Sequence, residues 1–68
     1  MRLTVNGKAT DIESGVTLQK LLEQYDISNV QKGIAVAVNS TVVPRESWGE
    51  TALRDGDSIE IIHAVQGG

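Results

Sequence analysis

Hydrophobic and polar positions alternate over the first residues of the chain, which predicts a pair of short β-strands. Leu3 and Val5 share one face of a strand over 2–5. The following Asn6-Gly7 predicts a tight hairpin, because a type I′ turn needs positive φ at both central residues. A return strand over 9–13 completes this hairpin.

The next segment carries its apolar residues at helical spacing. Thr17 can cap a helix through its hydroxyl, and the helix is expected to stop near Asp26. Four residues at i, i+3, i+4 and i+7 form an apolar stripe that faces the core, namely Leu18, Leu21, Leu22 and Tyr25. The residue after the stop, Ile27, is expected to turn back toward the core.

Two more strands follow this helix. Ile34 to Val38 is apolar at every position, which predicts a strand that is central in a sheet or covered on both faces. Asn39-Ser40 predicts a turn into a strand over 41–43. Pro44 ends that strand, because proline has no N–H to donate to a ladder.

The last third of the chain predicts a short helical turn over 45–49, a tight turn at Asp55-Gly56-Asp57 and a final strand over 58–65. Two strands, one helix and then more strands predict an α+β fold, in which one main helix packs across one face of a mixed sheet of four to five strands. We expect a single domain over 1–65 and a flexible tail over 66–68.

Length and charge limit the function classes. A chain of 68 residues with a net charge of −3 allows one modest core and lacks the basic patches that nucleic acids or anionic membranes require. No apolar run approaches the roughly 20 residues that span a bilayer. The first residues are too short and polar for a signal peptide, so a cytoplasmic location is expected.

The candidate chemical groups within the body of the chain are few. There is no cysteine, which excludes disulfides, zinc–thiolate sites and a thiol nucleophile from this chain. His63 is the only histidine and is expected where the last strand leaves the core. Asp55 and Asp57 match turn chemistry better than a metal loop. We therefore expect no metal site, no bound cofactor and no intrinsic ATP site.

The sequence ends in Gly67-Gly68, and this diglycine is its most informative chemical feature. Glycine gives a tail backbone freedom to enter a narrow enzyme tunnel. A terminal carboxylate with a pKa of about 3.3–3.7 is ionised at neutral pH and can attack the α-phosphate of ATP. An ordinary frayed end is the alternative. If extended, Gln66 to Gly68 reach about 10 Å from the body.

Two surface features before the tail suggest partner binding. Ile62 and Ala64 fall on the parity that should be polar in a half-exposed strand. Either the strand is covered on both faces, or an apolar patch faces solvent there and marks a partner contact, which we favour. Arg45 can pair with a partner's carboxylate or phosphate, although a solvated arginine is the simpler expectation. Trp48 is expected to pack structurally.

Three stretches resemble the sulfur carriers of thiamine biosynthesis, the ThiS family, whose fold is the ubiquitin-like β-grasp. They are A-V-N-S-T-V-V-P-R-E-S-W over 37–48, L-R-D-G-D-S-I-E-I over 53–61 and A-V-Q-G-G over 64–68. The combination is specific, whereas G-D or G-G alone is not. The likeness covers essentially the whole chain and is weaker over 26–32.

The resemblance implies a carrier and not an enzyme. An E1-like adenylyltransferase (ThiF-type) would use ATP to adenylate the carboxylate of Gly68, with Val65, Gln66, Gly67 and Gly68 entering its active site. A sulfur donor such as a cysteine desulfurase would then replace AMP and leave a thiocarboxylate. A thiazole synthase (ThiG-type) would receive that sulfur. The diglycine would need no proteolytic maturation.

Three other readings remain open. The small subunit of molybdopterin synthase shares the fold, tail and activation chemistry, but resembles this chain less, because those chains are longer and usually carry phenylalanine and prolines before the diglycine. A ubiquitin-like protein modifier would attach the same activated end to lysines. A plain interaction domain would use no activation chemistry.

Overall fold

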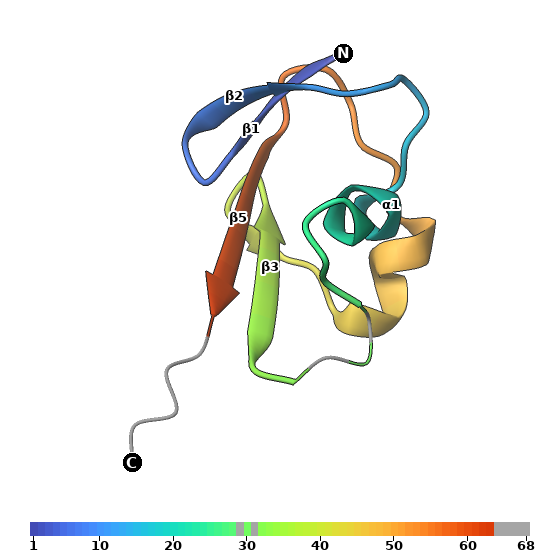
Figure 1. Ribbon diagram of the computed structural model, residues 1–68, viewed down its shortest axis with the longest axis vertical. Helices are drawn as coiled ribbons and strands as arrows, with labels where there is room; N and C mark the ends of the chain where they lie inside the picture. The colour runs from blue at the N-terminus through green and yellow to red at the C-terminus, as the bar shows by residue number, and fades with distance from the viewer. Residues whose placement is uncertain (29, 31, 64–68) are drawn as a thin grey trace.

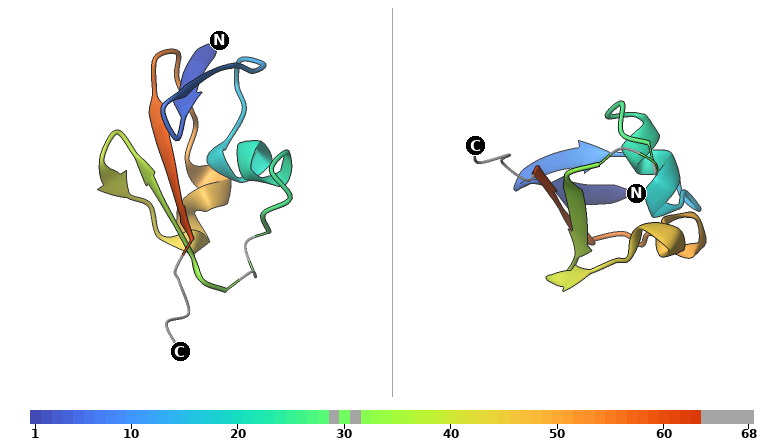
Figure 2. Two further views of the ribbon diagram at one scale, coloured as in Figure 1. Left: turned by 60° about the vertical axis from the view of Figure 1, so that its left-hand side comes forward. Right: turned by 90° about the horizontal axis from the view of Figure 1, so that it is seen from below.

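The computed structural model describes residues 1–28, 30 and 32–63. Seven elements follow one another along this part of the chain: β1 (Arg2–Val5), β2 (Lys8–Asp11), α1 (Leu18–Glu23), β3 (Ile34–Val38), β4 (Thr41–Val42), the 3₁₀ helix η1 (Arg45–Glu50) and β5 (Ser58–His63) (Figure 1). The strands form one sheet, and α1 and η1 lie on the same face of it (Figure 2). None of the described helices has the length and apolar character needed to cross a bilayer.

The strand order in the sheet is β2-β1-β5-β3-β4, so the last strand of the chain lies in the middle. β5 runs parallel to β1, with Val5 opposite Ile59, and antiparallel to β3, with Ile34 opposite His63. The two hairpins, β1–β2 and β3–β4, form the edges. The predicted α+β fold with a mixed sheet and one main helix on one face is confirmed.

Local sequence explains the first hairpin. Asn6 and Gly7 adopt φ of 52° and 81°, which is the left-handed conformation that a type I′ turn requires. β2 extends from Lys8 to Asp11. The predicted strand over 9–13 therefore starts one residue too late and ends two residues too late. Ile12 lies just beyond the strand and still exchanges backbone hydrogen bonds with Met1, at 2.9 Å and 2.6 Å.

The helix starts as predicted, because the Thr17 hydroxyl accepts a hydrogen bond from the Lys20 N–H at 3.3 Å. It ends at Glu23, before the expected stop near Asp26. A Schellman motif closes it: the Ile27 N–H donates to the Leu22 carbonyl at 3.0 Å, and Asp26 has φ of 60°. Ile27 is buried, as expected.

Tyr25 was predicted on the buried stripe, and this is wrong. The side chain is 42% exposed. The helical period that would bring it over the core has already stopped at Glu23, and the chain turns through Gln24 to Asp26. The three leucines of the stripe are fully buried.

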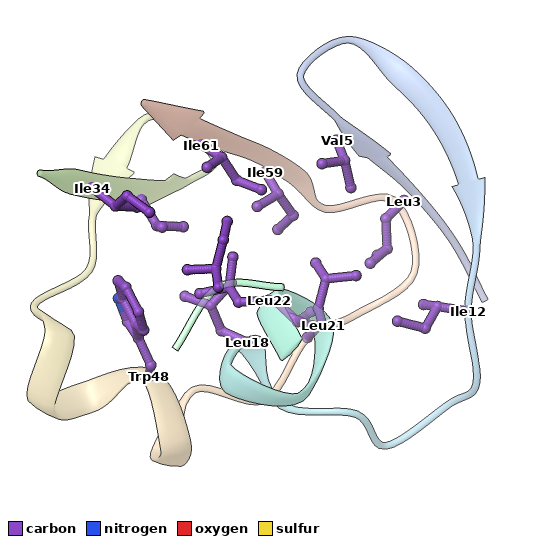
Figure 3. Packing of buried hydrophobic residues seen from close by; sticks show 13 residues of the cluster. Leu3, Val5, Ile12, Leu18, Leu21, Leu22, Ile34, Trp48, Ile59 and Ile61 are labelled. Atoms are coloured by element: carbon purple, nitrogen blue, oxygen red, sulfur yellow. The ribbon is translucent and has the colours of Figure 1, made fainter. Parts of the chain in front are cut away.

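The core fills the space between the sheet and the two helices (Figure 3). Trp48, from η1, is 1% exposed, and its Nε1–H donates to the Val43 carbonyl at 3.1 Å. The structural role predicted for Trp48 is therefore confirmed. The other large buried residues come from β1, α1, β3 and β5, and include Leu3, Leu18, Leu21, Leu22, Val36 and Ile59.

β3 lies inside the sheet between β5 and β4, and its outer face is covered at Ala37 but open at Ala35. Val36 is fully buried on the helix side, whereas Ala35 on the other face is exposed. The predicted strand over 41–43 is shortened to Thr41–Val42, and the predicted helical turn over 45–49 is the 3₁₀ helix Arg45–Glu50.

Candidate functional site

The predicted tail, Val65, Gln66, Gly67 and Gly68, lies outside the described residues, as does Ala64. The structure therefore shows the site up to His63, the last residue of β5. His63 is exposed at the end of the strand, opposite Ile34, which agrees with the predicted position of this histidine. The predicted domain boundary at residue 65 stays a prediction.

β5 brings the chain to this point along the centre of the sheet. Ile59 and Ile61 point into the core and are 0% and 8% exposed (Figure 3). Hydrogen bonds from both neighbouring strands hold its first half, for example from the Asn6 N–H to the Ile59 carbonyl at 2.8 Å. The end of the chain is thus attached to the central strand of the sheet.

Apolar residues gather on the face of the sheet opposite the helices. Ile62 lies opposite Ala35, and Val42 lies opposite Ala37. Ile62 is 49% exposed and Val42 is 63% exposed, while Ala37 is covered between its neighbours. We call the exposed residues Ala35, Val42 and Ile62 the outer patch; Ala37 lies between them on the same face and is buried. Exposed apolar surface of this kind commonly marks a contact with a partner.

The sequence left open whether Ile62 is covered or faces solvent, and the structure shows that it faces solvent. The strand is central, yet its outer face is uncovered within the described structure, because both helices lie on the opposite face. Val42 and Ala35 were not predicted to belong to this surface. These two residues lie beside Ile62 because of the register of β3 with β4 and β5. The residues within one strand do not indicate which residues of another strand they will face.

Arg45 occupies a different position from the solvated one that was expected. Its guanidinium Nη2 donates to the Ile34 carbonyl at 3.0 Å, and the group lies over the Trp48 ring, 5.3 Å from the centroid. The side chain is only partly exposed. A role of Arg45 in partner binding stays a prediction.

Charged side chains also lie on the outer face, where the exposed Glu60 pairs with Ala37 across β5 and β3. On the far edge of the sheet, the Arg2 guanidinium hydrogen-bonds the Asp11 carboxylate at 3.1 Å and lowers the pKa of Asp11, with the Coulomb attraction of Arg2 adding to the shift. The same contact raises the pKa of Arg2. Both side chains are largely exposed, so this pair contributes little to stability.

The carboxylates of the turn at Asp55-Gly56-Asp57 accept hydrogen bonds that stabilise the fold. Asp57 accepts hydrogen bonds from the Arg54 N–H at 2.8 Å and from the Asn39 side chain at 2.9 Å. Asp55 accepts from the Arg2 N–H at 2.7 Å. The predicted turn is confirmed. No three histidine, aspartate or glutamate side chains of residues 1–28, 30 and 32–63 are grouped as a metal site would require.

A five-stranded mixed sheet with its C-terminal strand in the middle and its helices on one face defines a β-grasp domain of the ubiquitin-like class. Residues 3–68 match the model of the ThiS family, and the chain belongs to that family. The predicted fold and family are both confirmed.

Three comparisons support this assignment. The chain is 38% identical to the sulfur carrier protein ThiS of Escherichia coli, over the full length of both. The crystal structure of a thiamine biosynthesis protein (ThiS) from Geobacter metallireducens superposes with a TM-score of 0.83, at 30% identity and full coverage of both chains. The chain is also 31% identical to a segment that makes up 20% of a thiazole synthase from Paramagnetospirillum magneticum.

Proposed function

We propose that this protein is a sulfur carrier of thiamine biosynthesis, and that its working group is the carboxylate of Gly68. The observation that carries this proposal is the match to the E. coli sulfur carrier, which extends over the whole of both chains at 38% identity. The family match through residue 68 includes the diglycine. The protein supplies no reacting side chain in this scheme and acts as a carrier, not as a catalyst.

The chemistry takes place at one carbonyl carbon. The carboxylate of Gly68 attacks the α-phosphorus of ATP, pyrophosphate leaves, and an acyl-adenylate forms on an E1-like adenylyltransferase. The terminal sulfur of a persulfide, delivered by a donor such as a cysteine desulfurase, then attacks the acyl carbon, and a thiol reductant cleaves the resulting acyl disulfide; inorganic sulfide attacks directly and needs no reductant. AMP leaves with one of the original carboxylate oxygens, and the product is a thiocarboxylate. ATP is consumed by the partner, and no cofactor is bound to the carrier.

A thiazole synthase is the proposed acceptor of this sulfur. Support comes from the thiazole synthase of Paramagnetospirillum magneticum, one fifth of which is similar to this entire chain. Two activities that are joined in one polypeptide in one organism commonly work together as separate chains in another. The outer patch gives such a partner an apolar surface beside the strand that leads to Gly68.

Mass spectrometry of the reacted protein tests the proposal. The chain is incubated with an adenylyltransferase of the ThiF type, ATP and a sulfide source. The expected result is a mass increase equal to the exchange of one oxygen for sulfur, assigned by fragmentation to Gly68. Fragmentation is essential, because oxidation of Met1 adds a similar mass at the other end.

The control carries one additional residue after Gly68 and is expected to stay unmodified. Adducts on lysine side chains would instead indicate a protein modifier. An unmodified wild-type chain, or equal modification of the extended control, would rule the proposal out.

A further inference from the structure

The strand that carries the tail extends further than one of its neighbours. The last rung between β1 and β5 pairs Val5 with Ile59. β1 ends at Val5, and the chain then turns away through Asn6 and Gly7. β5 continues past this point to His63.

The side chain of Asn6 occupies the place where β1 would have continued. The Ile61 N–H donates to Asn6 Oδ1 at 2.8 Å, across 55 positions of sequence. A longer β1 would present a backbone carbonyl to this N–H. Asparagine suits the position because it tolerates the φ of 52° that the turn imposes and carries a carbonyl on a short side chain.

The side chain of Arg45 likewise takes the place of a missing strand partner, here for β3, the other neighbour of β5. β3 begins at Ile34, opposite His63, and β4 leaves the ladder after the Val43 N–H has donated to the Val36 carbonyl at 2.8 Å. Pro44 follows and has no N–H to offer. The Ile34 carbonyl is taken by Arg45 Nη2 at 3.0 Å instead.

We propose that Asn6 is a positioning residue for the activation of Gly68. By holding the Ile61 N–H on the β1 side, where β3 pairs with Ile62 and His63 on the other side, it fixes the direction of β5 up to His63, from which the chain continues to its terminal carboxylate. Arg45 supports the same end of the sheet through β3. This inference rests on the proposed function, because its consequence is measured in the adenylation of Gly68. Reacting groups must be held close to the productive geometry, and small displacements lower the rate of a step more than they weaken binding.

Two substitutions at Asn6 separate the hydrogen bond from the turn. Asn6→Gly keeps a residue that accepts positive φ and removes the side-chain carbonyl. Asn6→Asp keeps both the acceptor and the tolerance of positive φ, so it is the matched control. Neither change touches the outer patch, which is formed by β3, β4 and β5.

The two readouts are hydrogen exchange of the Ile61 amide and steady-state ATP–pyrophosphate exchange by a ThiF-type adenylyltransferase with the carrier as the varied substrate. Asn6→Gly is expected to speed exchange at Ile61 and to lower kcat about three- to tenfold, the factor that corresponds to one ordinary hydrogen bond. The KM for the carrier is expected to stay within about twofold, because the docking surface is intact. Asn6→Asp is expected to behave like the wild type in both measurements.

Several results would overturn the inference. They are an Ile61 amide that is unprotected in the wild type, a folded Asn6→Gly variant with wild-type kcat, and an Asn6→Asp variant as slow as Asn6→Gly. If Asn6→Gly does not fold, Asn6→Ala provides the second test: lowered kcat at constant KM with faster exchange at Ile61 supports the inference, and wild-type kcat overturns it. Absence of pyrophosphate exchange with the wild-type carrier would overturn the proposed function itself, and this inference with it.

Discussion

Replacing Ile62 is expected to weaken partner binding while leaving the fold intact. Complete burial of an isoleucine side chain contributes about 1.5–3 kcal/mol. Ile62 is 49% exposed, so a partner that covers it removes the exposed half of its surface from water. That half contributes about 1 kcal/mol, which corresponds to a Kd about fivefold higher for Ile62→Ala. Ile62→Glu is expected to weaken binding further, because it places a carboxylate in an apolar contact.

The neighbouring residue provides the matched control. Ile61 is 8% exposed and points into the core, so Ile61→Ala is expected to lower the free energy of unfolding by about 2–4 kcal/mol. Ile62→Ala should change that free energy by no more than about 0.5 kcal/mol. Urea denaturation measures the stabilities, and calorimetric titration with the adenylyltransferase and with thiazole synthase measures the Kd values. An unchanged Kd for Ile62→Glu with both partners would refute the reasoning about the outer patch.

Three further outcomes are expected. Gly67→Ala should slow adenylation without moving the urea midpoint, because residues 66–68 are predicted to lie outside the domain; equal losses of activation and stability would contradict this. Trp48→Phe removes the donor to the Val43 carbonyl and leaves a void, so the free energy of unfolding should fall by about 2–4 kcal/mol, measured by circular dichroism. Asp11, whose pKa the Arg2 guanidinium lowers, stabilises the fold above its unfolded pKa and loses that contribution as pH falls through the folded value. Asp11→Asn should therefore flatten the acid side of the stability–pH curve at low salt, and an unaltered slope would argue against the shift.

The elements of this fold could be predicted because local chemistry determines most of them. Asn6-Gly7 predicts a hairpin turn between two short strands, because a type I′ turn needs two consecutive residues that accept positive φ, and both do so here. Thr17 marks the start of the helix through its own hydroxyl, and Pro44 ends a strand for want of an N–H. Each of these signals lies within a few residues of the structure that it specifies.

The errors and omissions involve the point where the helix ends and the contacts between strands. The exposure of Tyr25 follows from where the helix closes, and that depends on the Schellman motif at Asp26 and Ile27. The place of Arg45 depends on the Ile34 carbonyl being left without a strand partner after Pro44. Apolar spacing carries neither relation, because the first depends on a backbone conformation at Asp26 and the second on the register of β4 against β3.

One residue of the outer patch could be predicted from its own strand, whereas the other residues depend on how the strands pair. Ile62 could be singled out from its own strand, since it breaks the alternation that Glu60 obeys. Val42 and Ala35 lie beside it only because β5 pairs with β3 at Ala35, and β3 pairs with β4 at Ala37. The outer patch was therefore partly visible in the sequence, through Ile62, which breaks the local alternation.

Under the proposed function, the placement of β5 explains how a small domain presents its chain end to a partner. The strand lies between β1 and β3, its two inward isoleucines are buried, and where β1 stops the Asn6 side chain holds Ile61 while β3 pairs with Ile62 and His63. A central strand of this kind opens only when most of the domain unfolds. The strand therefore stays fixed up to His63, the last described residue before the tail. It follows that substitutions in the body can change how the carboxylate is presented while the chemistry at its carbon stays the same, which is why kcat at Asn6 and Kd at Ile62 are expected to respond separately.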